Sequence, residues 1–210
     1  MQLTKFKHAC FTVTKDMQTI VVDPGVFSTD FIAPDNVVAI IITHQHPDHL
    51  DPTKIQSILE RSPNATIYAH ESASDHLQDV KISSVQAGDI VSSGPFTLAF
   101  YGGQHAIIDA SIPPIANLGV MINDHLYYPG DSFVAPDEPV HTLALPIAAP
   151  WMKISEAMAF LAQIKPDMTF PTHDAILSQE GKEIYDRLLT ASASTHETNY
   201  QRLSSPIQLT

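Results

Sequence analysis

The residues best suited to chemistry lie in one short stretch, ITHQHPDHLD, at positions 42–51. It places His44, His46, Asp48 and His49 within six positions, directly after an apolar run. Imidazole and carboxylate groups without a thiolate are ligands that suit zinc, manganese or iron. The stretch therefore predicts a metal site, and a solvated histidine-rich loop is the alternative interpretation.

The apolar run before these residues, VVAIIIT at 37–43, has the composition of a buried strand. Side chains alternate between the two faces of a strand, so His44 and His46 are expected on the same side. Asp48 and His49 follow where the chain turns, which would place a second pair of ligands beside the first. One strand end can therefore supply ligands to two adjacent metal ions.

The rest of the chain alternates short apolar runs with amphipathic stretches, which is typical of a mixed α/β fold. Further strands are expected at 11–14, 19–23, 65–70, 141–147 and 167–173, and around 91–103 and 117–131. Helices are expected at 51–63, 71–79, 154–165 and 178–192. In the first helix, Asp51 is the expected N-cap and Pro52 the first residue. The Thr/Ser-rich tail near 190–210 is expected to be loosely held, and we predict a single domain spanning residues 1–210.

Composition excludes several classes of protein. The formal net charge is −12 and the basic residues are scattered, which argues against nucleic-acid binding. Cys10 is the only cysteine, so no internal disulfide can form, and a buried structural thiol is expected there. The N-terminus lacks the pattern of a secretory signal, and no apolar stretch approaches the roughly 20 residues that span a bilayer. We expect a cytoplasmic protein without membrane insertion.

The spacing His44-x-His46-x-Asp48-His49 resembles the signature of the metallo-β-lactamase superfamily of metal-dependent hydrolases. The other motifs of that family can be matched in order: Asp23 in TIVVDPG, His105 in YGGQHA, Asp131 in LYYPGDS and His173 in MTFPTHD. The resemblance implies an αββα four-layer sandwich, in which two sheets pack face to face with helices outside. Within the superfamily, the N-terminal KHACFTV most resembles small bacterial hydrolases related to ascorbate-phosphate lactonase and the phosphodiesterase-like branch.

This resemblance also implies ligands for two metal ions: His44, His46 and His105 for the first, Asp48, His49 and His173 for the second, and Asp131 as a bridge. Zinc is the expected metal, with manganese or iron as alternatives. Two such ions would lower the pKa of a bound water toward about 7, and the resulting hydroxide would hydrolyse an ester, lactone, amide or phosphoester bond of a small molecule. Asp48 and Asp131 are the predicted catalytic carboxylates. Asp23 is predicted to accept the second N–H of a ligand histidine, and a plain turn residue is the alternative.

Two other functions remain open from the sequence. A mononuclear iron oxidoreductase of the persulfide-dioxygenase type would use His44, His105 and Asp131, and a metal-binding scaffold would bind ions without turnover. Metal identity and activity distinguish these from a hydrolase. A homo-oligomer is compatible with the sequence, which does not establish it.

Four residues near the motifs allow two interpretations each. His8 either reaches the pocket or is a satisfied histidine, and Asp174 either tunes the neighbouring His173 or caps the closing segment. Trp151 either packs in the core or contacts substrate. Lys153 either binds an anionic group or is a solvated lysine at a helix start. The apolar, proline-rich segment after His105 is a candidate pocket wall.

Overall fold

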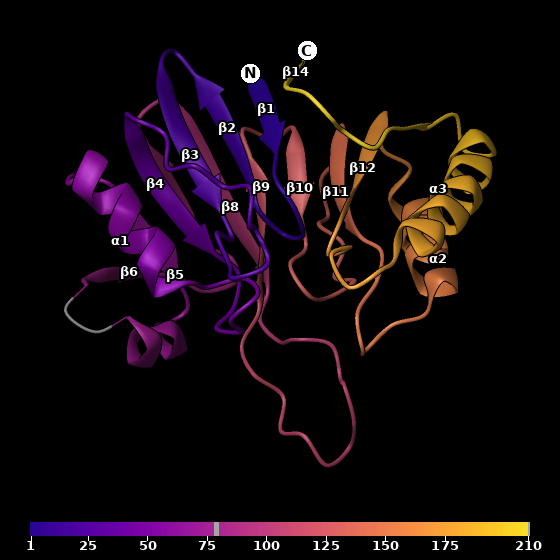
Figure 1. The fold of residues 1–210 in the computed structure, drawn as a ribbon, viewed down its shortest axis with the longest axis horizontal. Helices are drawn as coiled ribbons and strands as arrows, with labels where there is room; N and C mark the ends of the chain where they lie inside the picture. The colour runs from indigo at the N-terminus through magenta and orange to yellow at the C-terminus, as the bar shows by residue number, and fades with distance from the viewer. Residues whose placement is uncertain (78–79, 210) are drawn as a thin grey trace.

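The structure, a computed structural model, describes residues 1–77 and 80–209. Within these residues, fourteen strands form two seven-stranded sheets that pack face to face (Figure 1). The first sheet has the order β14-β1-β2-β3-β4-β5-β6 and the second β13-β12-β11-β10-β9-β8-β7. Helix α1 covers the outer face of the first sheet, and helices α2 and α3 cover that of the second. The predicted four-layer αββα sandwich is confirmed.

The elements have the following bounds. The strands of the first sheet are β1 (Gln2–Lys5), β2 (Phe11–Lys15), β3 (Gln18–Val22), β4 (Val37–Ile42), β5 (Thr66–Ala69), β6 (Ile82–Ser84) and β14 (Ile207–Gln208). The strands of the second are β7 (Ile90–Ser93), β8 (Phe96–Gly102), β9 (Leu118–Ile122), β10 (Leu126–Tyr128), β11 (Thr142–Pro146), β12 (Met168–Thr172) and β13 (Asn199–Tyr200). The helices are α1 (Pro52–Arg61), the 3₁₀ helix η1 (Glu71–His76), α2 (Ile154–Ile164) and α3 (Gln179–Ser194).

Strand β4 shows why the run VVAIII is apolar without interruption. Ala39 and Ile41 pack in the core between the two sheets, whereas Ile40 and Ile42 pack on the other face, in the core beneath α1. A strand that pairs in parallel on both sides, as β4 does with β3 and β5, is covered on both faces and needs apolar residues at every position. The strand that precedes the histidine-rich stretch is therefore held rigidly from both sides.

The chain directions bring several strand ends to one edge of the sandwich. Parallel strands β3 and β4 end at this edge, as do β8, β10 and β12 of the second sheet. In Figure 1 it is the lower edge, from which the long loop between β8 and β9 projects. Loops that follow five strands therefore meet at one place between the sheets.

Most elements expected from the sequence are present. Helix α1 begins at Pro52 and its N-cap Asp51 accepts a hydrogen bond from the Thr53 amide at 2.9 Å, as predicted. The expected helix at 71–79 is a 3₁₀ helix at 71–76, and its last two predicted residues, 78–79, lie outside the described residues. Strands β1, β6, β13 and β14 were not predicted, because two to four residues carry too little periodicity to be recognised.

The expectation of a loosely held tail is wrong. Helix α3 extends to Ser194, and the chain then contributes β13 to the second sheet and β14 to the first. Between these strands, the guanidinium of Arg202 forms two hydrogen bonds of 2.7 Å with the carboxylate of Asp186 and another contact with Asp174. The tail is held by backbone pairing and ion pairs, which its Thr/Ser-rich composition does not indicate.

None of the helices in the part of the chain that the structure describes is long and apolar enough to cross a bilayer.

Candidate metal centre

Three of the residues at the lower edge have a left-handed backbone. Their φ angles are 61° at His8, 44° at Asp23 and 58° at His173. This region is uncommon for residues other than glycine, although Asp, Asn and His enter it more readily than most. Such conformations cost free energy and persist where the surrounding structure fixes them, often at functional sites. Here they turn the side chains back toward the space between the sheets.

Two glycines allow the loops to approach each other closely. A Cβ atom at Gly25 would lie 1.8 Å from the backbone oxygen of Asp48. Gly130, which precedes Asp131, has a φ of 64°, and a Cβ there would lie 2.4 Å from Oδ1 of Asn117. A larger side chain at either position would push a loop away from the site, so these two glycines set the spacing of the residues that follow.

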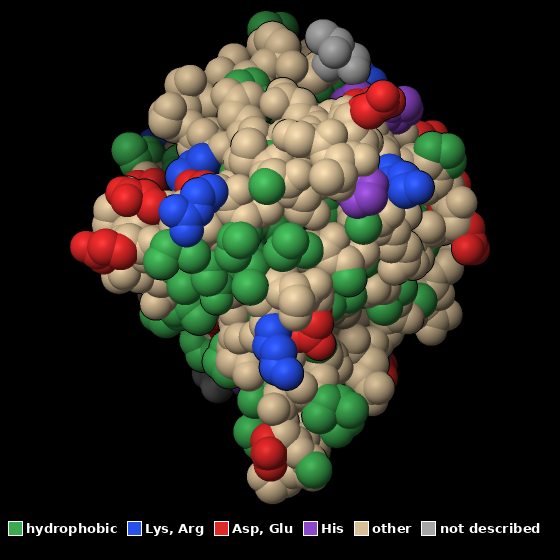
Figure 2. Space-filling view, turned by 90° about the vertical axis from the view of Figure 1, so that its right-hand side faces the viewer, with side chains coloured by type: hydrophobic (Ala, Val, Ile, Leu, Met, Phe, Trp, Pro, Cys, Tyr) green, Lys and Arg blue, Asp and Glu red, His purple; other side chains and the backbone are tan. Residues whose placement is uncertain are grey.

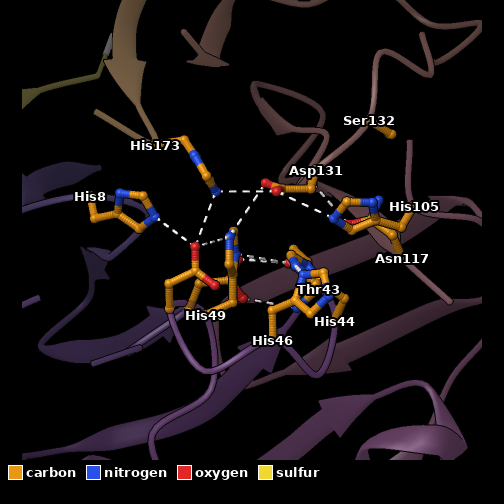
Figure 3. A network of polar contacts seen from close by, with 12 residues as sticks. His8, Thr43, His44, His46, His49, His105, Asn117, Asp131, Ser132 and His173 are labelled. Carbon is orange, nitrogen blue, oxygen red and sulfur yellow. Dashed lines mark hydrogen bonds and ion pairs between the residues drawn. The ribbon is translucent and has the colours of Figure 1, made fainter. Parts of the chain in front are cut away.

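Six of the seven predicted metal ligands come together in two groups, and the seventh, Asp131, lies between them (Figure 3). Ligand atoms of His44, His46 and His105 lie within 4.8 Å of one another, and so do those of a second group, His8, Asp48, His49 and His173. The first group joins the loop after β4 to the loop after β8, and the second joins it to the end of β12. The structure therefore brings together the histidines and aspartates that the sequence separates by more than a hundred residues.

The carboxylate of Asp131 lies between the two groups. Its Oδ1 is 3.3 Å from Nε2 of His49, and its Oδ2 is 3.1 Å from Nε2 of His173 and 3.4 Å from Nε2 of His105. A carboxylate with one oxygen available to each side has the position of a bridging ligand. The side chain of Asp131 is 4% exposed, so it is held by protein contacts and not by solvent.

Four histidines have one ring nitrogen occupied by a hydrogen bond. The Nδ1 atoms of His105 and His173 each lie 2.6 Å from a backbone oxygen, that of Ala106 and that of Ala148. A carbonyl oxygen can only accept, so these Nδ1 atoms carry the proton and Nε2 is left for a ligand bond. His49 Nδ1 donates to Asp23 at 2.7 Å and His44 Nδ1 to the hydroxyl of Thr43 at 3.0 Å. The same tautomer results at all four.

The donor set fits a metal ion. Nε2 of His49, His105 and His173 and Oδ1 of Asp131 are buried without a hydrogen-bond partner among the described residues. Leaving buried polar atoms unpaired costs about 1–3 kcal/mol each, so several converging atoms of this kind indicate a missing partner. Imidazole nitrogens and carboxylate oxygens suit zinc and other divalent first-row metals. The cluster can therefore hold metal, and these residues are the ones that would hold it.

Charges within the cluster are strongly coupled. Burial by itself lowers the pKa of His173, but the carboxylates of Asp131 and Asp48 outweigh it and raise this pKa to about 9. Burial likewise opposes the charge on His49, yet Asp131 and Asp23 hold its pKa well above the ordinary value. The pKa of Asp131 lies well below its usual range, because His49 and His173 outweigh the effect of burial. A metal ion that binds here must displace protons from histidines.

Asp23 lies where the sequence predicted a partner for a ligand histidine. It is fully buried, and its Oδ2 accepts the Nδ1 proton of His49. The same carboxylate accepts from the amide of Thr43 at 2.8 Å and from its hydroxyl at 2.7 Å. Asp23 is thus a fixed acceptor that orients His49 directly and His44 through Thr43.

His8 is a fully buried member of the second group, and its hydrogen bonds distinguish it from the predicted ligands of that group. Its Nδ1 accepts from the amide of Ala175 at 3.3 Å, so a neutral His8 carries its proton on Nε2. That Nε2 lies 3.0 Å from Oδ2 of Asp48 and donates to it. The pKa of His8 is lowered to about 4, mainly by burial, so the ring is neutral near pH 7. His8 therefore reaches the pocket as a donor to Asp48.

Trp151 contacts the site directly. Its indole N–H donates to Oδ2 of Asp131 at 2.8 Å, and its ring packs edge-on against Phe133, with centroids 5.1 Å apart. The ring centroid of His105 is 6.2 Å away. The two interpretations of Trp151, core packing and substrate contact, both missed this hydrogen bond to the predicted bridging carboxylate.

The other open residues have structural roles. Asp174 pairs with Arg202 and, at 3.5 Å, with Lys182, so it belongs to an ion-pair network behind His173. Its role is therefore neither of the two that the sequence suggested, adjustment of His173 or capping of the closing segment. Lys153 is exposed at the start of α2, as expected for a solvated lysine. Cys10 is fully buried, and burial raises the pKa of its thiol to about 12, in agreement with a structural role.

Two residues of the site were missed by sequence analysis. Thr43 links Asp23 to His44 through its hydroxyl. Asn117 accepts a hydrogen bond from the Asp131 amide at 2.9 Å and donates to the carbonyl of Pro129 at 2.9 Å, which fixes the turn that carries Asp131. Thr43 adjoins the motif and could have been considered. Nothing local marks Asn117, because its role depends on the pairing of β9 with its neighbours.

Comparison with known proteins agrees with this geometry. A family model described as the β-lactamase superfamily domain matches residues 2–173. Protein Rv0786c of Mycobacterium tuberculosis (strain ATCC 25618 / H37Rv) is 38% identical over 200 residues, which cover 93% of this chain and 94% of that protein.

Two solved structures have a similar fold. One is named a metal-dependent hydrolase, from Parabacteroides distasonis; it has a TM-score of 0.75 and 21% identity, with 95% of this chain and 91% of that chain covered. The other is the metallo-β-lactamase fold protein YhfI of Bacillus subtilis, with a TM-score of 0.74 and 17% identity, covering 98% of this chain and 97% of that chain. Because a matched family model covers most of the sequence and the sheets superpose on this sandwich, the chain belongs to the β-lactamase superfamily and has the metallo-β-lactamase fold.

Proposed function

We propose that the protein is a dinuclear, zinc-dependent hydrolase that acts on an ester, lactone, amide or phosphoester bond of a small molecule. The observation that carries the proposal is the set of buried ligand atoms without hydrogen-bond partners, which converge from both sheets on either side of Asp131. Two divalent ions bound there would supply Lewis acidity and a hydroxide near neutral pH, from a water whose pKa falls toward about 7.

The two carboxylates differ in their surroundings. The Asp131 side chain is 4% exposed and held by Trp151 and Asn117, which suits a fixed bridging ligand. The Asp48 side chain is 21% exposed, so it borders the space from which substrate and water arrive. Asp48, held by the N–H of His8, can orient the attacking water and accept its proton.

For an ester, the reaction consumes one water. The water oxygen forms a bond to the carbonyl carbon, the bond from that carbon to the leaving oxygen breaks, and the proton of water passes to the departing alkoxide. Acid and alcohol are the products. The proton can travel through Asp48, because this carboxylate is accessible at the mouth of the site.

Two ions account for the buried nitrogens better than one. A single iron on His44, His105 and Asp131 would leave the converging ligand atoms of the second group, Asp48, His49 and His173, unused. The donor set therefore favours the dinuclear hydrolase over a mononuclear oxidoreductase. A measured rate of hydrolysis would distinguish the hydrolase from a scaffold that binds metal without catalysis.

The test is elemental analysis of the purified protein together with hydrolysis of p-nitrophenyl acetate and bis(p-nitrophenyl) phosphate. We expect about two zinc ions per chain, and loss of both zinc and hydrolysis in His46→Ala and Asp131→Ala. His76→Ala, which removes an exposed histidine outside the site, is the control and should behave like the wild type. One iron per chain would favour the oxidoreductase, and two metals without turnover on either substrate would favour the scaffold.

The proposal includes a cytoplasmic protein that takes a small-molecule substrate, without a nucleic-acid or membrane partner. The face in Figure 2 supports the absence of a nucleic-acid partner, because its few lysines and arginines do not form a continuous basic patch. A homo-oligomer also remains a proposal, and size-exclusion chromatography with light scattering would test it.

A further inference from the structure

The loop 103–117 between β8 and β9 projects beyond the edge of the sandwich (Figure 1). Its base is fastened by a backbone hydrogen bond of 2.9 Å from His105 to Ile115. At its tip, the carboxylate of Asp109 accepts from the amide of Ser111 at 2.9 Å. Hydrogen bonds therefore order the loop at its base and at its tip. The loop also carries His105, one of the ligands of the first group.

A pocket of about 60 Å³ lies between this loop and the metal centre. The pocket is lined by His46 and His105 and by loop residues that include Ile108, Ile112 and Ile115. None of its lining residues, as far as the chain is described, is a lysine, arginine, aspartate or glutamate. The pocket is thus an apolar extension of the site on the side of the first group.

The loop also exposes apolar surface to water. Ile107 is 70% exposed and Ile112 is 48% exposed, and Figure 2 shows hydrophobic side chains on the projection at the lower end of the molecule. Exposed apolar side chains gathered beside a functional site are typical of a surface that a ligand covers. The gain from covering them is roughly 25 cal/mol per Å² of apolar surface removed from water.

We propose that this pocket binds a small, uncharged apolar group of the substrate, next to the bond that is hydrolysed. The inference rests on the proposed hydrolase function and narrows its substrate class to neutral esters and lactones with a short alkyl group on the side of His46 and His105. Since one water needs roughly 10–15 Å³ of cavity, the pocket of about 60 Å³ accepts about four to six groups of that size. A propyl or isopropyl group fits, and a long acyl chain does not.

Contact with the metal centre identifies the occupant as substrate. Two of the lining side chains, His46 and His105, are themselves proposed ligands, so any group in the pocket lies beside the reacting bond. The absence of a cationic side chain from the described lining disfavours phosphate or carboxylate at this position, because a buried anion needs a charged or hydrogen-bonding partner.

Hydrolysis of a matched ester series tests the subsite with the zinc-loaded protein. We expect kcat/KM to be about 10-fold higher for p-nitrophenyl butyrate than for the acetate, because added methylenes in an apolar pocket give discrimination of this order. It should fall again for the octanoate, which exceeds the pocket. The anionic p-nitrophenyl hemisuccinate should react at least about 10-fold more slowly than the butyrate, since its carboxylate would be desolvated.

Ile112→Asn makes the loop wall polar at a half-exposed position, where the fold should tolerate it. We expect the preference for butyrate over acetate to fall to less than about 3-fold, because the butyrate rate should fall more than the acetate rate. Ile90→Asn is the matched control, because Ile90 is 70% exposed on β7 and does not line the pocket. An equal loss on both esters, or an unchanged preference in Ile112→Asn, would overturn the subsite.

A binding measurement separates failure of the subsite from failure of the hydrolase proposal. Butyramide, which is uncharged, is titrated into protein labelled at isoleucine methyl groups and followed by NMR. The methyl signals of Ile108, Ile112 and Ile115 should shift while that of Ile90 does not, whether or not any ester is hydrolysed. Shifts without hydrolysis would leave the pocket standing and refute the hydrolase, and hydrolysis without shifts or acyl preference would refute the pocket.

Discussion

Replacing Asp23 by asparagine changes one atom of the site in a predictable way. The asparagine oxygen can still accept from the Thr43 amide, but an NH₂ group takes the position of Oδ2, 2.7 Å from Nδ1 of His49. Because that NH₂ group donates, Nδ1 of His49 must become an acceptor and the ring proton must move to Nε2. The Nε2 atom of His49 would then no longer offer its lone pair to a metal.

The size of the effect follows from these contacts. Partners that fix a metal-ligating histidine are worth about 10- to 100-fold in metal affinity, which is about 1.4–2.7 kcal/mol. The backbone should not add to this cost, because asparagine adopts the left-handed conformation of residue 23 as readily as aspartate. Loss of the charged acceptor should also lower the free energy of unfolding by about 1.5–3 kcal/mol.

The assay is a competition titration of metal-free protein with zinc and a chromophoric chelator. We expect the wild type to take up two equivalents and Asp23→Asn to bind one of them about 10- to 100-fold more weakly. Asp51→Asn is the matched control, because it removes the same charge from the N-cap of α1, where asparagine caps as well as aspartate. Far-UV circular dichroism checks that both variants are folded.

One result would refute this reasoning about His49. If a folded Asp23→Asn protein bound both zinc ions with wild-type affinity, Asp23 would be a turn residue and His49 would not depend on its carboxylate. Equal weakening in the Asp51→Asn control would instead show that net charge, and not the hydrogen bond, sets the affinity.

Three further experiments address the other contacts of the site. Trp151→Phe keeps an aromatic ring but removes the hydrogen bond from the indole N–H to Asp131. Because hydrogen bonds to charged groups contribute about 1.5–3 kcal/mol, zinc affinity should fall by about 10-fold. An unchanged affinity in the competition titration would contradict this. His8→Met should lower kcat by about 10-fold, because it removes the hydrogen-bond donor to Asp48. His8→Gln has the same left-handed backbone to adopt as the Met variant but can donate a hydrogen bond, so it should recover activity. Loss of a zinc ion in both variants would identify His8 as a ligand instead. Zinc binding at pH 7 should release protons, because the pKa of His173 is raised to about 9 in the metal-free protein and its Nε2 must be deprotonated to bind. Affinity should therefore increase as pH rises toward 9, and calorimetry in buffers of different ionisation enthalpy that found no proton release would exclude this.

The sequence was informative about the fold wherever a pattern is local. The continuous apolar run of β4 and the capping residues of α1 have physical causes within a few positions, so both were predicted. Strands β13 and β14 have two residues each, and only pairing with β12 and β1 makes them strands. The tail was misjudged for the same reason, since composition does not reveal a partner strand.

In the site, as in the fold, residues with a local pattern were predicted and long-range contacts were not. The spacing of His44, His46, Asp48 and His49 and the resemblance that it supports led to all seven proposed ligands, and the structure places them together. The surroundings were less predictable. The hydrogen bond from the Trp151 indole to the carboxylate of Asp131 depends on contacts between distant segments. Such contacts have no periodicity or spacing that could be recognised in one sequence.

The distribution of the proposed ligands along the chain has a consequence for the order in which the two groups become complete during synthesis. The first group is complete once His105 has been made, whereas the second must wait for His173 at the end of β12. A ribosome adds residues from the N-terminus, so the ligands become available in that order. The second group joins loops of the first sheet to the end of β12 in the second sheet, so it can form only after both sheets have most of their strands.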